Sequence, residues 1–320
     1  LAERLAAPVL TTYMARGLLG SSHPCAVGLP PHLPEAGRLW DEADAVLAIG
    51  TDFDGMMTQN WAMPRPRHLV AINVDAADAA KSYEPELVLE GDAAAVSAAL
   101  AERLPAPRGV DALRARLAEV RREARARLEN EHPDEMRFLS VFASAVPEEA
   151  VVVADMCIAG YWLGALHPVS APRKLAYPMG WGTLGYGFPL AIGSALAGNG
   201  PVVSVSGDGG FLYACGELAT VAQERIPLTA VIVDDGGYGM LRFDQRHRGE
   251  ATFGVDLVTP DFEALARSFG VEAETVDGLG EEFGLALTRQ MAVAAPTVLV
   301  ARAALEPPPT TSPRWYRRAP

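Results

Sequence analysis

The sequence predicts an α/β protein with two Rossmann-like domains, each built on a parallel sheet. Short apolar runs alternate with alanine-rich helical stretches along most of the chain, which is the pattern of βαβ units. A charged helical stretch flanked by prolines divides this alternation into two series. The chain has 320 residues, and at roughly 150 residues per domain two domains are the expected number.

The first series contains the expected strands Ala45–Gly50 and His68–Val74 and the expected helix Ala93–Leu104. We assign it to a first domain at residues 1–108. The opening residues, LAERLAAPVLTTY, read as the middle of a helix and suggest that an upstream part of this domain is missing.

The charged stretch Val110–Glu131 predicts a linker helix at residues 109–133, because prolines stand on both sides of it. A second α/β domain follows at residues 134–305, and a proline-rich tail at 306–320. The expected strands of the second domain are Ala150–Ala154, Val202–Ser206, Thr229–Val233 and Thr297–Val300, and its expected helices are Tyr213–Glu224 and Asp261–Phe269.

Composition narrows the function classes. The formal net charge is −13 and the sequence pI is about 4.9, so nucleic acid and anionic membrane surfaces are not the expected partners. Only three cysteines occur, without a CxxC pair, which argues against a disulfide scaffold or a cysteine zinc site and fits a cytoplasmic protein. The uncharged stretch Leu175–Gly207 contains too many glycines and prolines for a lipid-exposed helix, so we interpret it as buried loop, helix and strand.

Two short acidic motifs end strand-like runs of the second domain. They are GDGG at residues 207–210 and DDGGYG at residues 234–239. If the two strands are neighbours, Asp208 and Asp235 project from one sheet edge and can share a divalent cation. The glycines let a phosphate approach backbone amides closely. Either acid alone would be interpreted as a turn residue, but the two motifs together favour a metal site.

GDG, a spacer of 24 residues and a second acidic motif resemble the thiamine-diphosphate motif of one enzyme family, which reads GDG, a similar spacer, then NN. The family includes acetolactate synthase, pyruvate oxidase and benzoylformate decarboxylase. Ala176–Leu196 resembles its segment that holds the aminopyrimidine ring, and Leu1–Asp92 resembles its central domain. The resemblance implies a truncated central domain at 1–108, followed by a thiamine-diphosphate-binding fold.

The resemblance also implies site residues. Asp208 and Asp235 would be side-chain ligands of Mg²⁺, with the Gly237 carbonyl as a third ligand. The Gly182 carbonyl would accept a hydrogen bond from the 4′-amino group of the cofactor, and Leu184 would wedge the cofactor into its bent conformation. Six further residues are implied to bind the cofactor, largely through backbone amides that face the diphosphate: Gly207, Gly209, Gly210, Tyr238, Gly239 and Met240.

The sequence departs from the family pattern at three points. Asp235 stands where the family has a metal-binding asparagine, and Asp244 stands where acetolactate synthases have a tryptophan. The pyrimidine-binding domain, whose glutamate protonates the cofactor, has no counterpart in these residues. The chain alone is therefore expected to be catalytically incomplete, and its catalytic residues stay unassigned. The segments Val27–His32 and Asp52–Met56 lack the FAD patterns of some family members, which makes FAD an unexpected cofactor.

The implied reaction is Mg²⁺- and thiamine-diphosphate-dependent decarboxylation of a small-molecule 2-oxoacid, or its ligation to a second carbonyl. Family active sites form between subunits, so a homodimer or homotetramer is expected.

Two other functions remain open. Gly180–Gly185 matches the GxGxxG fingerprint of NAD(P)-dependent oxidoreductases by letter, with Asp208 at the position of a ribose-binding acid. The chain could also be a non-catalytic remnant that acts as a partner subunit. The segment Arg242–Arg248, which contains His247, is expected to be a loop, either closing over the cofactor or lying in solvent.

Overall fold

The computed structural model describes residues 1–309, which form two compact units. The first unit contains Leu1–Ala15 and Leu19–Arg127, and the second contains Arg16–Leu18 and Leu128–Pro308. The predicted proline-rich tail lies outside the described residues from residue 310 onward.

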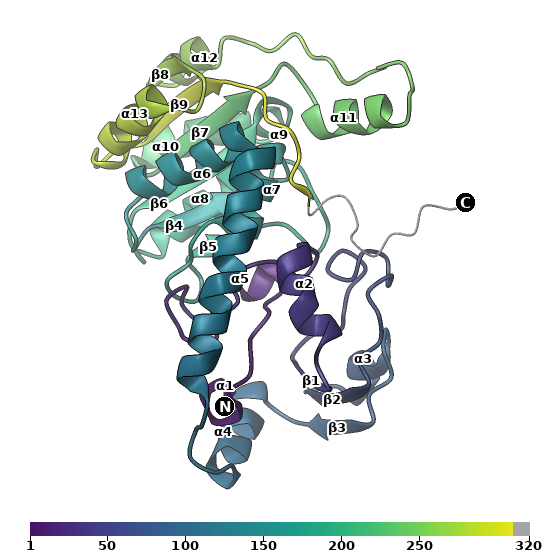
Figure 1. The fold of residues 1–320 in the computed structure, drawn as a ribbon. Helices are drawn as coiled ribbons and strands as arrows, with labels where there is room; N and C mark the ends of the chain where they lie inside the picture. Colours follow the sequence, from purple (N-terminus) through teal and green to yellow (C-terminus); the bar gives the residue numbers. More distant parts are fainter. Residues whose placement is uncertain (310–320) are drawn as a thin grey trace. The chain divides into compact units, whose positions relative to one another are not determined.

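The first unit contains a three-stranded parallel sheet in the order β1-β2-β3, which can be followed in Figure 1. Asp75 and Asp92 begin helices by accepting hydrogen bonds from the amides of Ala77 and Ala95, at 2.8 and 2.9 Å. Its elements are α1 (Ala2–Leu5), η1 (Tyr13–Ala15), α2 (Pro34–Asp41), β1 (Ala45–Ile49), β2 (His68–Asn73), α3 (Ala76–Ala80), β3 (Leu87–Glu90), α4 (Ala93–Arg103) and most of α5 (Val110–Glu131).

The opening of the chain corrects one expectation. Helix α1 spans four residues and ends at Ala6, which has a left-handed φ of 46°. Ala7 precedes Pro8, and a residue before proline is disfavoured in the helical region. The helix therefore stops here instead of continuing through LAERLAAPVLTTY.

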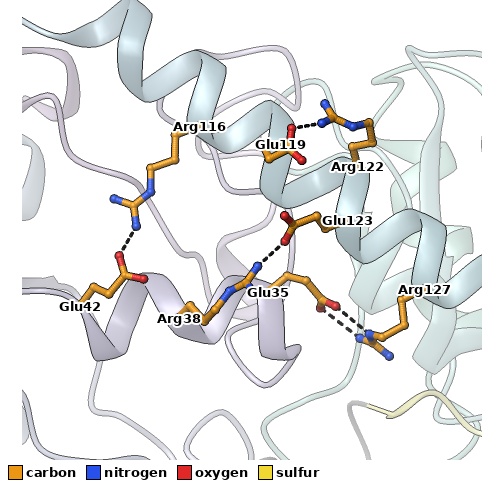
Figure 2. A network of polar contacts seen from close by, with 8 residues as sticks. All are labelled: Glu35, Arg38, Glu42, Arg116, Glu119, Arg122, Glu123 and Arg127. Carbon is orange, nitrogen blue, oxygen red and sulfur yellow. Dashed lines mark hydrogen bonds and ion pairs between the residues drawn. The ribbon is translucent and has the colours of Figure 1, made fainter.

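Helices α2 and α5 of the first unit are joined by ion pairs (Figure 2). Arg127 holds Glu35 through two hydrogen bonds, from Nε at 2.7 Å and from Nη2 at 3.1 Å. Two further pairs, Arg38 with Glu123 and Arg116 with Glu42, lie at more exposed positions along the same helices, and Arg122 pairs with Glu119 within α5. The charges of α5 thus serve to pack it within its unit.

The second unit contains a six-stranded parallel sheet in the order β5-β4-β6-β7-β9-β8 (Figure 1). Two parallel sheets were predicted, and this part of the prediction is confirmed. The elements of the unit are α6 (Pro133–Ala145), β4 (Val151–Ala154), α7 (Ile158–Leu166), β5 (Leu175–Ala176), α8 (Gly187–Leu196), β6 (Val202–Gly207), α9 (Asp208–Leu212), η2 (Cys215–Glu217), α10 (Leu218–Glu224), β7 (Thr229–Asp234), α11 (Gly239–His247), α12 (Phe262–Ser268), β8 (Glu272–Asp277), α13 (Glu281–Met291) and β9 (Thr297–Arg302).

Both faces of the six-stranded sheet are covered by helices. Alternate strand residues such as Ala230 and Ile232 pack with Phe188 of α8 and Phe262 of α12. On α6 and α13, Phe138, Phe142 and Phe283 are fully buried, and the ring of Phe138 contacts the other two. Burial on both faces explains why the central strands, such as β4 and β7, read as nearly continuous apolar runs.

The segment after β6 corrects a second expectation. The predicted helix Tyr213–Glu224 is instead a bend at Tyr213 and Ala214 followed by two pieces, η2 and α10, and a separate short helix, α9, begins directly at Asp208. The uncharged stretch Leu175–Gly207 forms β5, a turn, α8 and β6. Its helix and strand agree with the interpretation, but the turn is not buried, since Trp181 is 96% exposed. Within residues 1–309, no helix is both long and apolar enough to cross a membrane.

Candidate functional site

The carboxyl ends of β6 and β7 are the centre of the candidate site. The strands pair in parallel with Gly207 opposite Val233, so the chain leaves both at the same edge of the sheet. Asp208 directly follows β6 and Asp235 directly follows β7. The two strands are therefore neighbours, and Asp208 and Asp235 lie at the same edge, as expected under that condition.

Asp208 is a buried carboxylate that is only partly satisfied. Its residue is 1% exposed. Oδ1 accepts a hydrogen bond from the Gly209 amide at 2.7 Å, whereas Oδ2 has no hydrogen-bond partner. Burial, together with the negative charges of Asp235 and Asp234, raises the pKa of Asp208 to about 7. A cation bound here would oppose this shift, because it favours the ionised carboxylate.

The turn after β7 is held against the segment before α12. The Gly236 carbonyl accepts from the Leu257 amide at 2.9 Å, and the Tyr238 amide donates to the Val255 carbonyl at 2.8 Å. Between them, Gly237 has a φ of +150°, and a Cβ there would lie 2.1 Å from the Val255 oxygen. Only glycine fits at this position. Gly237 forms an antiparallel bridge with Asp256, and in this bridge the Gly237 carbonyl points away from the Asp256 segment.

Asp235 lies beside an arginine that the sequence reasoning missed. Arg242 Nη1 is 3.6 Å from Asp235 Oδ1, which is an ion pair too long to be a hydrogen bond. Burial raises the pKa of Asp235, while the charge of Arg242 opposes that shift. Asp235 Oδ1 is buried and has no hydrogen-bond partner.

A cavity of about 260 Å³ opens at this edge of the sheet. The residues around it come from the ends of β4, β6 and β7, the turn before α8, and the start of α11. The structure brings all of the predicted site residues to its walls: Gly182, Leu184, Gly207, Asp208, Gly209, Gly210, Asp235, Gly237, Tyr238, Gly239 and Met240.

Comparison with known proteins agrees with this geometry. Residues 155–301 match the C-terminal TPP binding domain of thiamine pyrophosphate enzymes, and residues 1–100 match the central domain of the same enzymes. The chain belongs to the thiamine pyrophosphate enzyme family. The match also supports thiamine diphosphate, the same compound under its other name, as the cofactor.

Relatives in this family carry two kinds of name. A probable 2-ketoarginine decarboxylase of Pseudomonas aeruginosa is 34% identical, over 88% of this chain and 51% of its own length. A probable acetolactate synthase large subunit of Methanocaldococcus jannaschii is 29% identical over 86% of this chain and 49% of its own, and the acetolactate synthase of Bacillus subtilis is 29% identical over 87% and 50%. The chain spans about half the length of these relatives.

The residues at the edge fit a divalent cation. Asp208 Oδ2 and Asp235 Oδ1 are buried oxygens without hydrogen-bond partners, and hard cations such as Mg²⁺ prefer oxygen ligands. No group of three or more His, Cys, Asp or Glu side chains within residues 1–309 could hold a metal ion. Two carboxylates lie close together at this edge, and the carbonyl of Gly237 as a third ligand, which the resemblance implies, stays a prediction.

The backbone around the cavity narrows the expected diphosphate contacts. The Gly209 amide donates to Asp208, and the Tyr238 amide donates to Val255, so both already have partners. The amides of Gly239 and Met240 lie in the first turn of α11, where helical amides have no partner four residues earlier. These two amides are the better candidates for facing an anion.

Asp155, at the end of β4, is a second residue that sequence reasoning missed. Its Oδ2 accepts from the Gly185 amide at 3.0 Å, and its Oδ1 accepts from the Met156 amide at 2.8 Å. Asp155 is 1% exposed, and burial raises its pKa. Gly185 has a φ of +74°, and a Cβ there would lie 2.7 Å from Tyr213 Cβ. Asp155 thus fixes the turn that carries Gly182 and Leu184.

One further wall of the cavity was not predicted by any sequence motif. It comes from the end of β4 and the start of α7 and includes Met156, Cys157, Ile158, Ala159 and Tyr161. Cys157 accepts from the Gly160 amide at 3.3 Å, and burial raises its pKa to about 12. The thiol is therefore protonated at neutral pH and behaves as a small apolar group.

The structure differs from two further expectations, the dinucleotide-binding fingerprint and the loop at Arg242–Arg248. The GxGxxG fingerprint requires a strand before it and a helix opening on its third glycine. Here β5 ends at Ala176 and α8 begins at Gly187, after Gly185, so that context is absent. The expected loop at Arg242–Arg248 is largely helix α11, in which His247 is exposed and stacks on Phe243.

Proposed function

We propose that this chain provides the metal and diphosphate half-site of a Mg²⁺- and thiamine-diphosphate-dependent enzyme acting on a 2-oxoacid. The observation that carries the proposal is the pair of buried, incompletely satisfied carboxylates, Asp208 and Asp235, on the wall of one cavity. If no cation bound here, each of these buried carboxylates would destabilise the folded protein with no compensating interaction.

Asp208, Asp235 and the Gly237 carbonyl would hold the Mg²⁺, and the amides of Gly239 and Met240 would face the diphosphate. Leu184 and the Gly182 carbonyl would orient the rest of the cofactor, with Asp155 fixing their turn. When bound, thiamine diphosphate supplies an electron sink that lets a 2-oxoacid lose carbon dioxide. The apolar wall from β4 and α7 would exclude water from the reacting centre.

Turnover is proposed to need the pyrimidine-binding domain that the family resemblance implies, because that domain supplies the activating glutamate. The same resemblance makes a homodimer or homotetramer the proposed assembly. The first test is therefore binding and not turnover.

The binding test is a calorimetric titration of the chain with thiamine diphosphate, in Mg²⁺ and again in EDTA, with NADH as control ligand. We expect saturable binding of thiamine diphosphate in Mg²⁺ only, and loss of at least about a hundredfold in affinity for Asp208→Ala. Binding of NADH instead would favour the oxidoreductase. Wild-type affinity in Asp208→Ala would refute the metal assignment, and no binding of either ligand would favour a non-catalytic remnant.

Decarboxylation is proposed ahead of acetolactate synthesis. The decarboxylase is the more similar of the two kinds of relative, and Asp244 stands where acetolactate synthases have tryptophan. Burial is the main cause that raises the pKa of the cavity residue Tyr161, and the charges of Cys157 and Asp244 add to it. Assays of the assembled enzyme with 2-ketoarginine and with pyruvate distinguish the two, since acetolactate forms only from pyruvate.

A further inference from the structure

We propose that the charge of Arg242 is what allows an aspartate to stand at position 235 of the metal loop. This inference rests on the proposed function, because it assigns a role toward the Mg²⁺ and the diphosphate. It goes beyond it by naming a residue outside the two acidic motifs.

The guanidinium of Arg242 gathers the loop that follows β7. Nη1 donates to the Asp235 carbonyl at 3.3 Å, and Nη2 donates to the Gly236 carbonyl at 3.0 Å. Nε donates to Asp256 Oδ1 at 2.8 Å. The side chain is 13% exposed, so these contacts are held in a largely dry setting. One arginine therefore joins the loop to the segment bridged to it at Gly237.

The same guanidinium approaches Asp235 without consuming it as a ligand. At 3.6 Å from Nη1, Asp235 Oδ1 experiences the positive charge but makes no hydrogen bond. Its lone pairs remain available to a cation. A shorter, bidentate pair would have competed with the metal.

Charge counting shows why a counter-charge is needed. Asp208 and Asp235 together cancel the two charges of Mg²⁺, which leaves nothing to attract the anionic diphosphate. Arg242 restores one positive charge, the same net charge that an asparagine at position 235 would give. Asp256 also pairs with Arg242, but its side chain is 67% exposed and its charge is screened by water.

The neighbouring Asp234 is a third negative charge at this edge, close enough to act on both Asp208 and Asp235, which adds to the need for a counter-charge. Its Oδ1 accepts from the Gly236 amide at 3.2 Å, and its Oδ2 lies 3.5 Å from the Thr259 hydroxyl. No arginine or lysine other than Arg242 lines the loop or the cavity among the contacts of the described residues. The balance therefore depends on Arg242.

The test compares Arg242→Met, Asp235→Asn and the double variant. Affinity for thiamine diphosphate is measured by calorimetry at saturating Mg²⁺, and affinity for Mn²⁺ alone by electron paramagnetic resonance. Arg242→Met is expected to weaken thiamine diphosphate binding about tenfold or more, and to leave Mn²⁺ binding unchanged or tighter, because a positive charge has left the cation's surroundings. In the double variant, Asp235→Asn is expected to restore thiamine diphosphate binding to within about threefold of wild type.

If Arg242 only holds the loop in shape, the result is different. Arg242→Met would then weaken the binding of both Mn²⁺ and thiamine diphosphate, and Asp235→Asn would restore neither, so this outcome overturns the proposal. Arg242→Lys keeps the charge without the fork and should recover most of the lost affinity. Arg248→Met is the matched control, since Arg248 caps the same helix but its Nε binds the Asp244 carbonyl and not the loop. Its affinities should equal those of the wild type.

The experiment separates the two proposals. If the wild type binds Mn²⁺ but not thiamine diphosphate, the proposed function fails, and the Mn²⁺ measurements still decide the role of Arg242. If the wild type binds both and Arg242→Met changes neither, only the present inference fails. A wild type that binds neither overturns both.

Discussion

The first and second units each bury a carboxylate, but the protein compensates the charge of only one of them. Glu35 is 7% exposed, and although burial would raise its pKa, the hydrogen bonds and charge of Arg127 hold that pKa below its ordinary value. Asp208 is 1% exposed, has one oxygen without a partner, and has a pKa of about 7. The first is paired for stability within its own unit. The second is left for a ligand from outside, which is how the two can be told apart without any motif.

The largest expected effect follows from breaking the satisfied pair. Arg127→Leu leaves Glu35 buried without a partner, and we expect a loss of about 3 kcal/mol in stability, the lower end for such pairs because Arg127 is 26% exposed. Hydrogen–deuterium exchange of α2 measures the loss within the first unit. The double variant with Glu35→Leu should regain most of it, since no buried charge then remains.

The matched control for that experiment lies on the same helix. Arg122 pairs only with Glu119 of α5 among its described contacts and is 69% exposed. Arg122→Leu should leave the exchange of α2 close to wild type. An equal loss in both variants would mean that the helix, and not the buried pair, was being tested.

The second expected effect has the opposite sign. Asp208→Asn removes a carboxylate whose pKa is about 7 in the folded chain and 3.8 in the unfolded chain. Between these values the folded state binds the extra proton, so the stability of the metal-free wild type falls as pH rises from about 4 to about 7 and stays lower above it. The variant lacks this loss. We expect it to be more stable than wild type in EDTA at pH 8 by on the order of 2 kcal/mol, and similar at pH 4.

Urea unfolding at the two pH values measures this difference, and saturating Mg²⁺ with thiamine diphosphate should reverse the order at pH 8, because only the wild type gains from binding. A less stable variant in EDTA at pH 8 would show that Asp208 is satisfied by a contact within the protein. The comparison with Glu35 would then lose its meaning.

The sequence predicted the parts of the fold that local chemistry determines. Buried strands such as β6 and β7 are largely apolar runs, and Asp92 and Asp261 stand where they cap α4 and α12. Strand β8 was missed because it is an edge strand with a polar sequence, EAETVD, and only two of its residues are buried. An edge strand pairs with a neighbour on one side only, so it needs fewer apolar residues than a central strand.

Some residues of the candidate site could likewise be predicted from the sequence, and others could not. The residues of the two acidic motifs could be found because they follow apolar strand-like runs and lie next to glycines in the sequence. Asp155 and Arg242 could not, since each acts across space: Asp155 on a turn 30 residues later, and Arg242 on Asp256 and the carbonyls before it. A lone acid after a strand, or a lone arginine in a helix, has no local signal that distinguishes it from a solvated charge.

The smallest expected effect tests whether exposure alone separates the pairs of the first unit. Arg116 and Glu42 join the same two helices as Arg127 and Glu35, but their side chains are 51% and 58% exposed (Figure 2). Water already solvates both charges, so Glu42→Gln should change stability by about 0.5 kcal/mol or less, and the change should vanish in high salt. Exchange of α2 at low and high ionic strength measures it. A loss approaching that of Arg127→Leu would mean that the ion pairs act as one network, and that the burial of Glu35 is not what makes its pair important.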